Sequence, residues 1–82
     1  MRYEVKLPSL GEDAGDEATV SFWYVDAGDE VKEGQDLLEM VTDKATFNVP
    51  SPKSGRLIEL KVKDNDRVLV GGLLATLEVK DR

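Results

Sequence analysis

An all-β fold is predicted by three features of this 82-residue sequence. Turn-forming glycine, proline and asparagine residues recur at short spacing along the chain. The runs between them are rich in Val, Leu, Ile, Thr and aromatic residues, which favour strands. No window has the sustained 3.6-residue apolar period of an amphipathic helix. These features together indicate a small all-β sandwich or barrel.

Eight strands are expected, each lying between turn-forming residues. The turn formers, in chain order, are Pro8, Gly11, Gly15, Gly28, Gly34, Pro50, Pro52, Gly55, Asn65, Gly71 and Gly72. The strands expected between them are 2–6, 18–25, 29–31, 36–42, 45–50, 55–63, 67–69 and 73–79. The two prolines that follow the fifth strand fix their own backbone angles and so stiffen the exit from it.

A weak internal repeat relates the two halves of the chain. Five residue types recur after 37 positions, in the pairs Val25/Val62, Asp29/Asp66, Val31/Val68, Gly34/Gly71 and Leu37/Leu74. Gly28 corresponds to Asn65, and both types tolerate the left-handed backbone of tight turns. We therefore expect quasi-repeats at about 18–41 and 55–78, packed with approximate two-fold symmetry. The expected core residues are Val25, Val31, Leu37, Val62, Val68 and Leu74.

Composition narrows the possible functions. A chain of this length is expected to form one domain, residues 1–82. It has no cysteine and no histidine, so disulfides, thiolate metal sites and the usual general base are missing; neither catalytic residues nor a metal site is expected. The formal net charge of −6 argues against nucleic acids and anionic membranes as partners. With no signal peptide or transmembrane segment recognised, a cytoplasmic protein is expected.

Lys44 is the candidate functional residue. It lies in the polar stretch 42–45 (TDKA) between two apolar runs, a pattern typical of a β-hairpin. Asp is favoured at the first position of a type I turn, so we expect the turn to begin at Asp43 with Lys44 next, on the tip. The stretch also joins the two quasi-repeats, which predicts that it lies at the end of the domain opposite the chain termini. A lysine held there is accessible to another enzyme.

The sequence resembles a lipoyl domain, the carrier module of 2-oxo acid dehydrogenase complexes. Residues 7–12 (LPSLGE) resemble the opening Pro-x-Leu-Gly-Glu of that family, and residues 23–31 (WYVDAGDEV) its Gly-Asp-x-Val segment. Residues 42–45 resemble its Asp-Lys-Ala modification site, and residues 49–52 with Gly55 resemble the segment that follows. The resemblance covers almost the whole chain, and the order and spacing of the motifs make it specific.

The resemblance implies a flattened barrel-sandwich hybrid of two four-stranded antiparallel sheets with pseudo-two-fold symmetry. Lys44 would carry lipoate in amide linkage, with Asp43 and Ala45 as flanking recognition residues. One departure is Val41, since many family members have Glu three residues before the lysine. That difference bears on which lipoate-attaching enzyme acts on the chain. The acidic loop 12–17 (EDAGDE) corresponds to a loop that helps partner recognition in the family, although a solubilising surface is the more common role of such a segment.

By the same resemblance the chain is a carrier rather than an enzyme, and part of or partner to an acyltransferase (E2) component. The lipoyl arm would move acyl groups and reducing equivalents between a thiamine-dependent 2-oxo acid decarboxylase (E1), the acyltransferase core and dihydrolipoamide dehydrogenase (E3). Tethering keeps each intermediate at high effective concentration. The isolated domain is expected to be a monomer, without nucleic-acid or membrane partners.

Two other functions share this fold. A biotin carrier also modifies a hairpin lysine, but biotin sites typically place Met on both sides of it, where this chain has Asp43 and Ala45. A non-carrier binding module of the same shape has no reason to keep a lysine at the tip. Two further features have structural interpretations: Trp23 as a partly buried packing residue, and residues 64–66 (DND) as a turn rather than a calcium loop.

Overall fold

The computed structural model describes residues 1–10 and 15–79, and it contains eight strands. In chain order they are β1 (Arg2–Lys6), β2 (Glu17–Trp23), β3 (Glu30–Val31), β4 (Asp36–Val41), β5 (Thr46–Pro50), β6 (Gly55–Leu60), β7 (Arg67–Leu69) and β8 (Leu73–Glu78). The predicted ends at residues 25 and 63 are too long, because the chain leaves the sheet after Trp23 and Leu60 to form tight turns. Within the described residues there is no helix, and hence none able to span a membrane.

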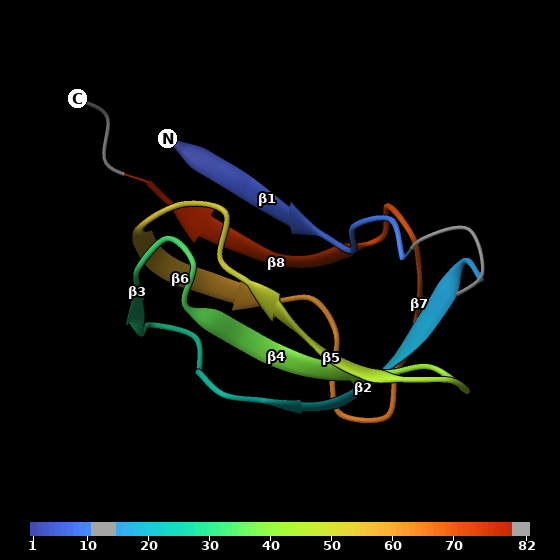
Figure 1. Ribbon diagram of the computed structural model, residues 1–82. Coiled ribbons are helices and arrows are strands. Elements are labelled where there is room, and N and C mark those ends of the chain that lie inside the picture. The colour runs from blue at the N-terminus through green and yellow to red at the C-terminus, as the bar shows by residue number, and fades with distance from the viewer. Residues whose placement is uncertain (11–14, 80–82) are drawn as a thin grey trace.

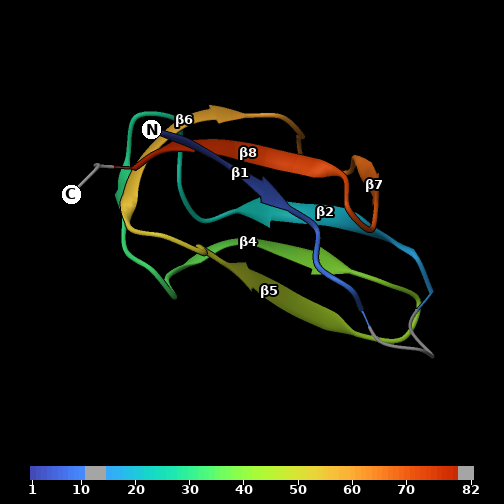
Figure 2. The ribbon, with the colours of Figure 1, turned by 90° about the horizontal axis from the view of Figure 1, so that it is seen from above.

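The strands form two four-stranded sheets whose faces pack together (Figures 1 and 2). One sheet has the order β1-β8-β6-β3 and the other β5-β4-β2-β7, and every strand pair is antiparallel. The predicted all-β architecture of two four-stranded antiparallel sheets is therefore confirmed. Each sheet keeps one face toward the other, which is how a small all-β chain buries its apolar side chains.

Three strands of each sheet correspond at the 37-residue offset, in the pairs β2/β6, β4/β8 and β3/β7. Thr19 pairs with Val41 between β2 and β4, and their counterparts Arg56 and Glu78 pair between β6 and β8. The register irregularities after Val20 and Leu57 also correspond. Equivalent backbone turns recur as well, since four of the five left-handed residues in the described part of the chain form the pairs Gly28/Asn65 and Gly34/Gly71, with Gly15 as the exception. The offset seen in the sequence thus reflects a pseudo-two-fold axis relating the two sheets.

The outer strands β1 and β5 follow a different offset. Gly34 donates its N–H to the carbonyl of Ser51, and its counterpart Gly71 donates to the carbonyl of Leu7, so here equivalent positions are 44 residues apart. The two offsets differ by about seven residues because the β1–β2 connection is longer than the β5–β6 connection. The extra residues belong to the acidic loop, of which residues 12–14 lie outside the described part of the chain.

The core lies between the sheets and is almost entirely aliphatic. Val25, Val31, Leu37, Val68 and Leu74 are buried as predicted, whereas Val62 is only partly buried. The largest fully buried side chains are Leu7, Leu37, Leu38, Met40, Leu57, Leu74, Leu77 and Val20. In keeping with the expectation for Trp23, its ring is partly buried against this core, and its Nε1–H donates to the carbonyl of Val62 at 3.0 Å.

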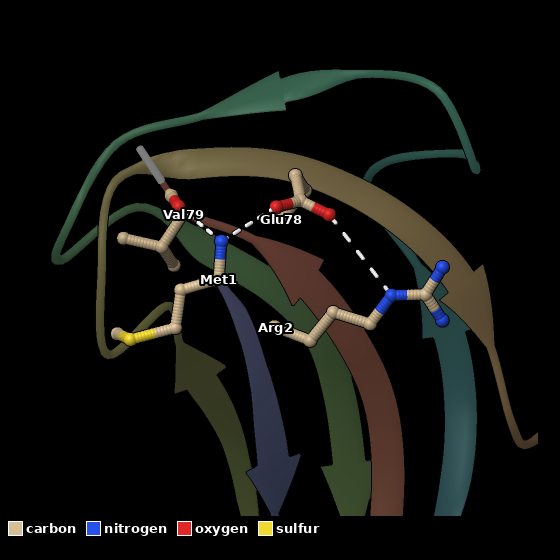
Figure 3. Close-up of polar contacts among 4 residues, drawn as sticks. All are labelled: Met1, Arg2, Glu78 and Val79. Carbon is tan, nitrogen blue, oxygen red and sulfur yellow. Dashed lines mark hydrogen bonds and ion pairs between the residues drawn. The ribbon is translucent and has the colours of Figure 1, made fainter. Parts of the chain in front are cut away.

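Polar contacts close the end of the molecule where β1 and β8 meet (Figure 3). The ammonium of Met1 donates to Oε2 of Glu78 at 2.7 Å and to the carbonyl of Val79 at 3.1 Å. Nε of Arg2 lies 4.0 Å from the other carboxylate oxygen of Glu78. The hydrogen bond and charge of the N-terminal ammonium lower the pKa of Glu78 from its ordinary value of 4.5. Burial opposes this shift, and the charge of Arg2 adds a smaller lowering effect.

This contact predicts a pH-dependent contribution to stability. Because the pKa of Glu78 is lowered on folding, its charge stabilises the folded state above pH 4.5, and the effect is lost as the pH falls through the lowered value. We expect Glu78→Gln to have a lower Tm than the parent at pH 7, with the gap narrowing in acid. Thermal unfolding followed by circular dichroism measures it, with Glu33→Gln on an exposed turn as control. A gap that stays constant into strong acid would contradict the assignment.

Candidate functional site

Lys44 lies on the connection between β4 and β5, at the end of the molecule opposite the two termini (Figures 1 and 2). The hairpin residues 42–45 follow directly after the last strand pair, Val41 with Thr46. The pseudo-two-fold axis relates this hairpin to the place where the chain ends meet: Thr42 donates its N–H to the carbonyl of Ala45, as Val79 does to that of Met1. The predicted position of Lys44, opposite the termini, is thereby confirmed.

The hairpin is held by Thr42. Its N–H donates to the carbonyl of Ala45 at 2.8 Å. Its Oγ1 accepts from the N–H of Ala45 at 3.1 Å and from the N–H of Lys44 at 3.2 Å, and lies 3.4 Å from the carbonyl of Ala45. Threonine hydroxyls often replace a backbone acceptor in this way at turns. The backbone hydrogen bond between Thr42 and Ala45 thus closes a tip of only two residues, Asp43 and Lys44.

The prediction that the turn begins at Asp43 is wrong by one residue. Strand pairing stops at Val41 and Thr46, which leaves Thr42 and Ala45 as the next opposed residues and makes Thr42 the first residue of the turn. The preference of Asp for the first turn position is overridden by this register and by the Thr42 hydroxyl. Lys44 remains at the tip, and Asp43, Lys44 and Ala45 are all exposed.

A groove of about 530 Å³ lies beside the hairpin. Its walls are formed by residues 15–19 at the start of β2, residues 41–43 and Arg67 of β7. Arg67 reaches Glu17 across the strands, with its Nη1 3.8 Å from Oε1. The described part of the acidic loop therefore lies next to the lysine hairpin, and Val41 lines the same groove. The sequence around Arg67 did not indicate a place in this site, because Arg67 reaches the groove only through the pairing of β2 with β7.

The Asp-Asn-Asp segment is a turn, as predicted. Oδ2 of Asp66 accepts from the N–H of Lys63 at 2.9 Å, and Asn65 has a left-handed backbone with φ of 74°. Its counterpart in the other half is the turn in which Oδ2 of Asp29 accepts from the N–H of Asp26. Among the described residues, no group of three or more acidic, histidine or cysteine side chains is arranged to hold a metal ion.

Comparison with known proteins identifies the family. The biotin/lipoyl family model, described as biotin-requiring enzyme, matches residues 3–77. The chain belongs to this family. A solved lipoyl domain of the 2-oxoglutarate dehydrogenase complex from Azotobacter vinelandii superposes with a TM-score of 0.75 at 28% identity, covering 95% of this chain and 98% of that one.

Two curated relatives of this biotin/lipoyl family member are larger proteins. The dihydrolipoyllysine-residue succinyltransferase component of the 2-oxoglutarate dehydrogenase complex of Bartonella vinsonii is 42% identical over 78 residues, 95% of this chain and 19% of the relative. The lipoamide acyltransferase component of the branched-chain alpha-keto acid dehydrogenase complex of Pseudomonas aeruginosa is 42% identical over 76 residues, 93% and 18% of the two chains. The chain therefore spans about a fifth of the length of these relatives.

The hydroxyl of Thr42 is expected to protect the hairpin amides of Lys44 and Ala45 from hydrogen exchange. Thr42→Val keeps the side-chain shape but removes the acceptor shared by two backbone N–H groups, at a net cost of about 0.5–1.5 kcal/mol. We expect faster amide hydrogen exchange at Lys44 and Ala45 and a small fall in the free energy of unfolding in urea. Thr42→Ser, which retains the acceptor, is the matched control. Unchanged exchange at both amides in the valine variant would show that the hydroxyl does not hold the turn.

Proposed function

We propose that the chain is a lipoyl carrier domain in which Lys44 bears lipoate in amide linkage on Nζ. The observation that carries this proposal is the placement of an exposed lysine on a two-residue hairpin tip, in a chain of the biotin/lipoyl family. A group joined there projects from the end of the domain rather than lying across a sheet. Lys44 and its hairpin thus fit a covalently attached arm without any preformed pocket.

The attachment chemistry needs little from the domain itself. The Lys44 ammonium loses a proton within the attaching enzyme, and its nitrogen lone pair forms the amide bond with the activated carboxyl carbon of lipoate as the activating group leaves. The formal net charge changes from −6 to −7, because an ammonium becomes a neutral amide. When bound, lipoate supplies a dithiolane that accepts acyl groups and electrons. The domain holds Lys44 forward on a rigid turn, with Asp43 and Ala45 offered beside it for recognition.

The partners proposed for the loaded domain are those of a 2-oxo acid dehydrogenase complex. They are the thiamine-dependent decarboxylase, the acyltransferase core and dihydrolipoamide dehydrogenase, besides the lipoate-attaching enzyme. Support comes from the two acyltransferase relatives, whose printed names place them in such complexes. We infer that the chain serves as the carrier part of, or partner to, an acyltransferase component. A cytoplasmic location and a monomeric isolated domain stay predictions.

Biotin is the second candidate cofactor, since the family model covers carriers of both kinds. The residues on either side of Lys44 favour lipoate, because Asp43 and Ala45 stand where biotin sites typically have Met. The likeness to a solved lipoyl domain along nearly its whole length supports the same choice.

The proposal is tested by intact-mass spectrometry. We expect incubation with a lipoate-attaching enzyme, lipoate and ATP to add the mass of one lipoyl amide to the parent chain and nothing to Lys44→Arg. The arginine variant keeps the positive charge but offers no acylatable amine. A gain retained by Lys44→Arg would move the site to another lysine. No gain, or a gain only with biotin and a biotin-attaching enzyme, would overturn the lipoate assignment.

A further inference from the structure

Two apolar side chains are exposed where β7 ends and the next turn begins. Leu69 is 60% exposed and Val70 is 38% exposed. Phe22 and Tyr24 are also exposed, but their rings pack edge-on at 4.9 Å, and the Tyr24 hydroxyl donates to Asn48 at 2.9 Å. The side chains of Leu69 and Val70 have neither a ring nor a polar group through which to make such contacts, and both are exposed to solvent.

The pseudo-two-fold axis shows that the turn does not need these apolar residues. The corresponding turn after β3 has Lys32 and Glu33 at the same two positions, both exposed. The backbones match: Gln35 donates to the carbonyl of Lys32 at 2.9 Å, as Gly72 does to that of Leu69 at 2.8 Å. The left-handed glycine that follows has φ of 89° in one turn and 86° in the other. The same turn thus occurs twice in the domain, once with a polar pair and once with an apolar pair.

Strand β7, which ends at Leu69, lies in the half of the molecule that holds the β4–β5 connection (Figures 1 and 2). Leu69 pairs with Glu17, which places both side chains on the same face of the sheet. On that face Thr19 is opposite both Arg67 of β7 and Val41 of β4, so β7 lies two strand spacings, about 10 Å, from the strand that leads into the hairpin. The groove beside the hairpin bridges this distance.

The groove beside the hairpin, which adjoins the apolar pair at Glu17 and Asp16, is lined by predominantly negative charge. Asp16, Glu17 and Asp43 line the groove, with Arg67 as the basic residue among the groove's walls. Asp16 also accepts the N–H of Val70 through its carbonyl at 2.8 Å, which ties the acidic segment to the apolar turn. A complementary partner surface has an apolar recess flanked by basic side chains.

We propose that Leu69 and Val70, with the neighbouring carboxylates, form a docking site for the enzyme that attaches lipoate to Lys44. The inference rests on the proposed function. It assigns this occupant because an unmodified lysine reaches outward only by its four-carbon stem, so the attaching enzyme must close onto the surrounding end of the domain.

The test exchanges one turn for the sequence of its symmetry mate. Leu69→Lys with Val70→Glu installs the residues that the equivalent backbone already accommodates at positions 32 and 33, so the fold is expected to persist. The mirror-image control, Lys32→Leu with Glu33→Val, makes the opposite change at the far end. Each chain is given to a lipoate-attaching enzyme with lipoate and ATP, and the rate of mass gain is followed against domain concentration.

We expect the Leu69→Lys, Val70→Glu chain to lose about tenfold in kcat/KM, mainly through KM, and the control to match the parent. An unchanged kcat/KM, or an equal loss in the control, overturns the docking site while the parent's mass gain still establishes the carrier. No gain in the parent overturns the carrier function itself and the docking site with it. Should circular dichroism show the double variant unfolded, Leu69→Ala is measured instead, with a KM unchanged from the parent overturning the proposal.

Discussion

Burial of one aliphatic layer between two sheets is the constraint on which this domain depends. The chain has no cysteine, and its described residues hold no metal cluster, so no covalent or metal cross-link supplements that layer. Most of the buried apolar residues come from the inner strands β2, β4, β6 and β8. The buried apolar residues of the described chain form one cluster shared by both sheets, so neither sheet buries its apolar face without the other. Both strands of the hairpin that carries Lys44, β4 and β5, contribute residues to this cluster.

Repetition of the half-domain explains how much of the fold was predictable. Tight turns need residues that accept a left-handed backbone, and this requirement left the pairs Gly28/Asn65 and Gly34/Gly71 in the sequence. Val31 and Val68 recur because each fills the same place in the core. Strand neighbours were not predictable in this way, because the pairing of β2 with β7 joins segments far apart in the chain. The proximity of Arg67 to the acidic segment depends on that pairing.

The hairpin shows where local preference fails. Two apolar runs around a short polar stretch located Lys44 correctly, because strand alternation and turn polarity are local properties. The turn's first residue depended on where pairing between β4 and β5 stops, at Val41 and Thr46. The hydroxyl of Thr42 then completes the turn. Thr42, which in the sequence is only the first residue of the stretch 42–45, thus makes the hydrogen bonds that hold the turn.

The two ends of the domain are related by the near symmetry of its halves but differ in what they carry. The domain is 39 Å long and 22 by 17 Å across, with the chain ends at one pole and Lys44 at the other. A polypeptide joined at Met1 therefore starts at the end of the domain that faces away from the lysine. For a domain tethered there, the length of the domain adds to the distance that a group attached to Lys44 can reach.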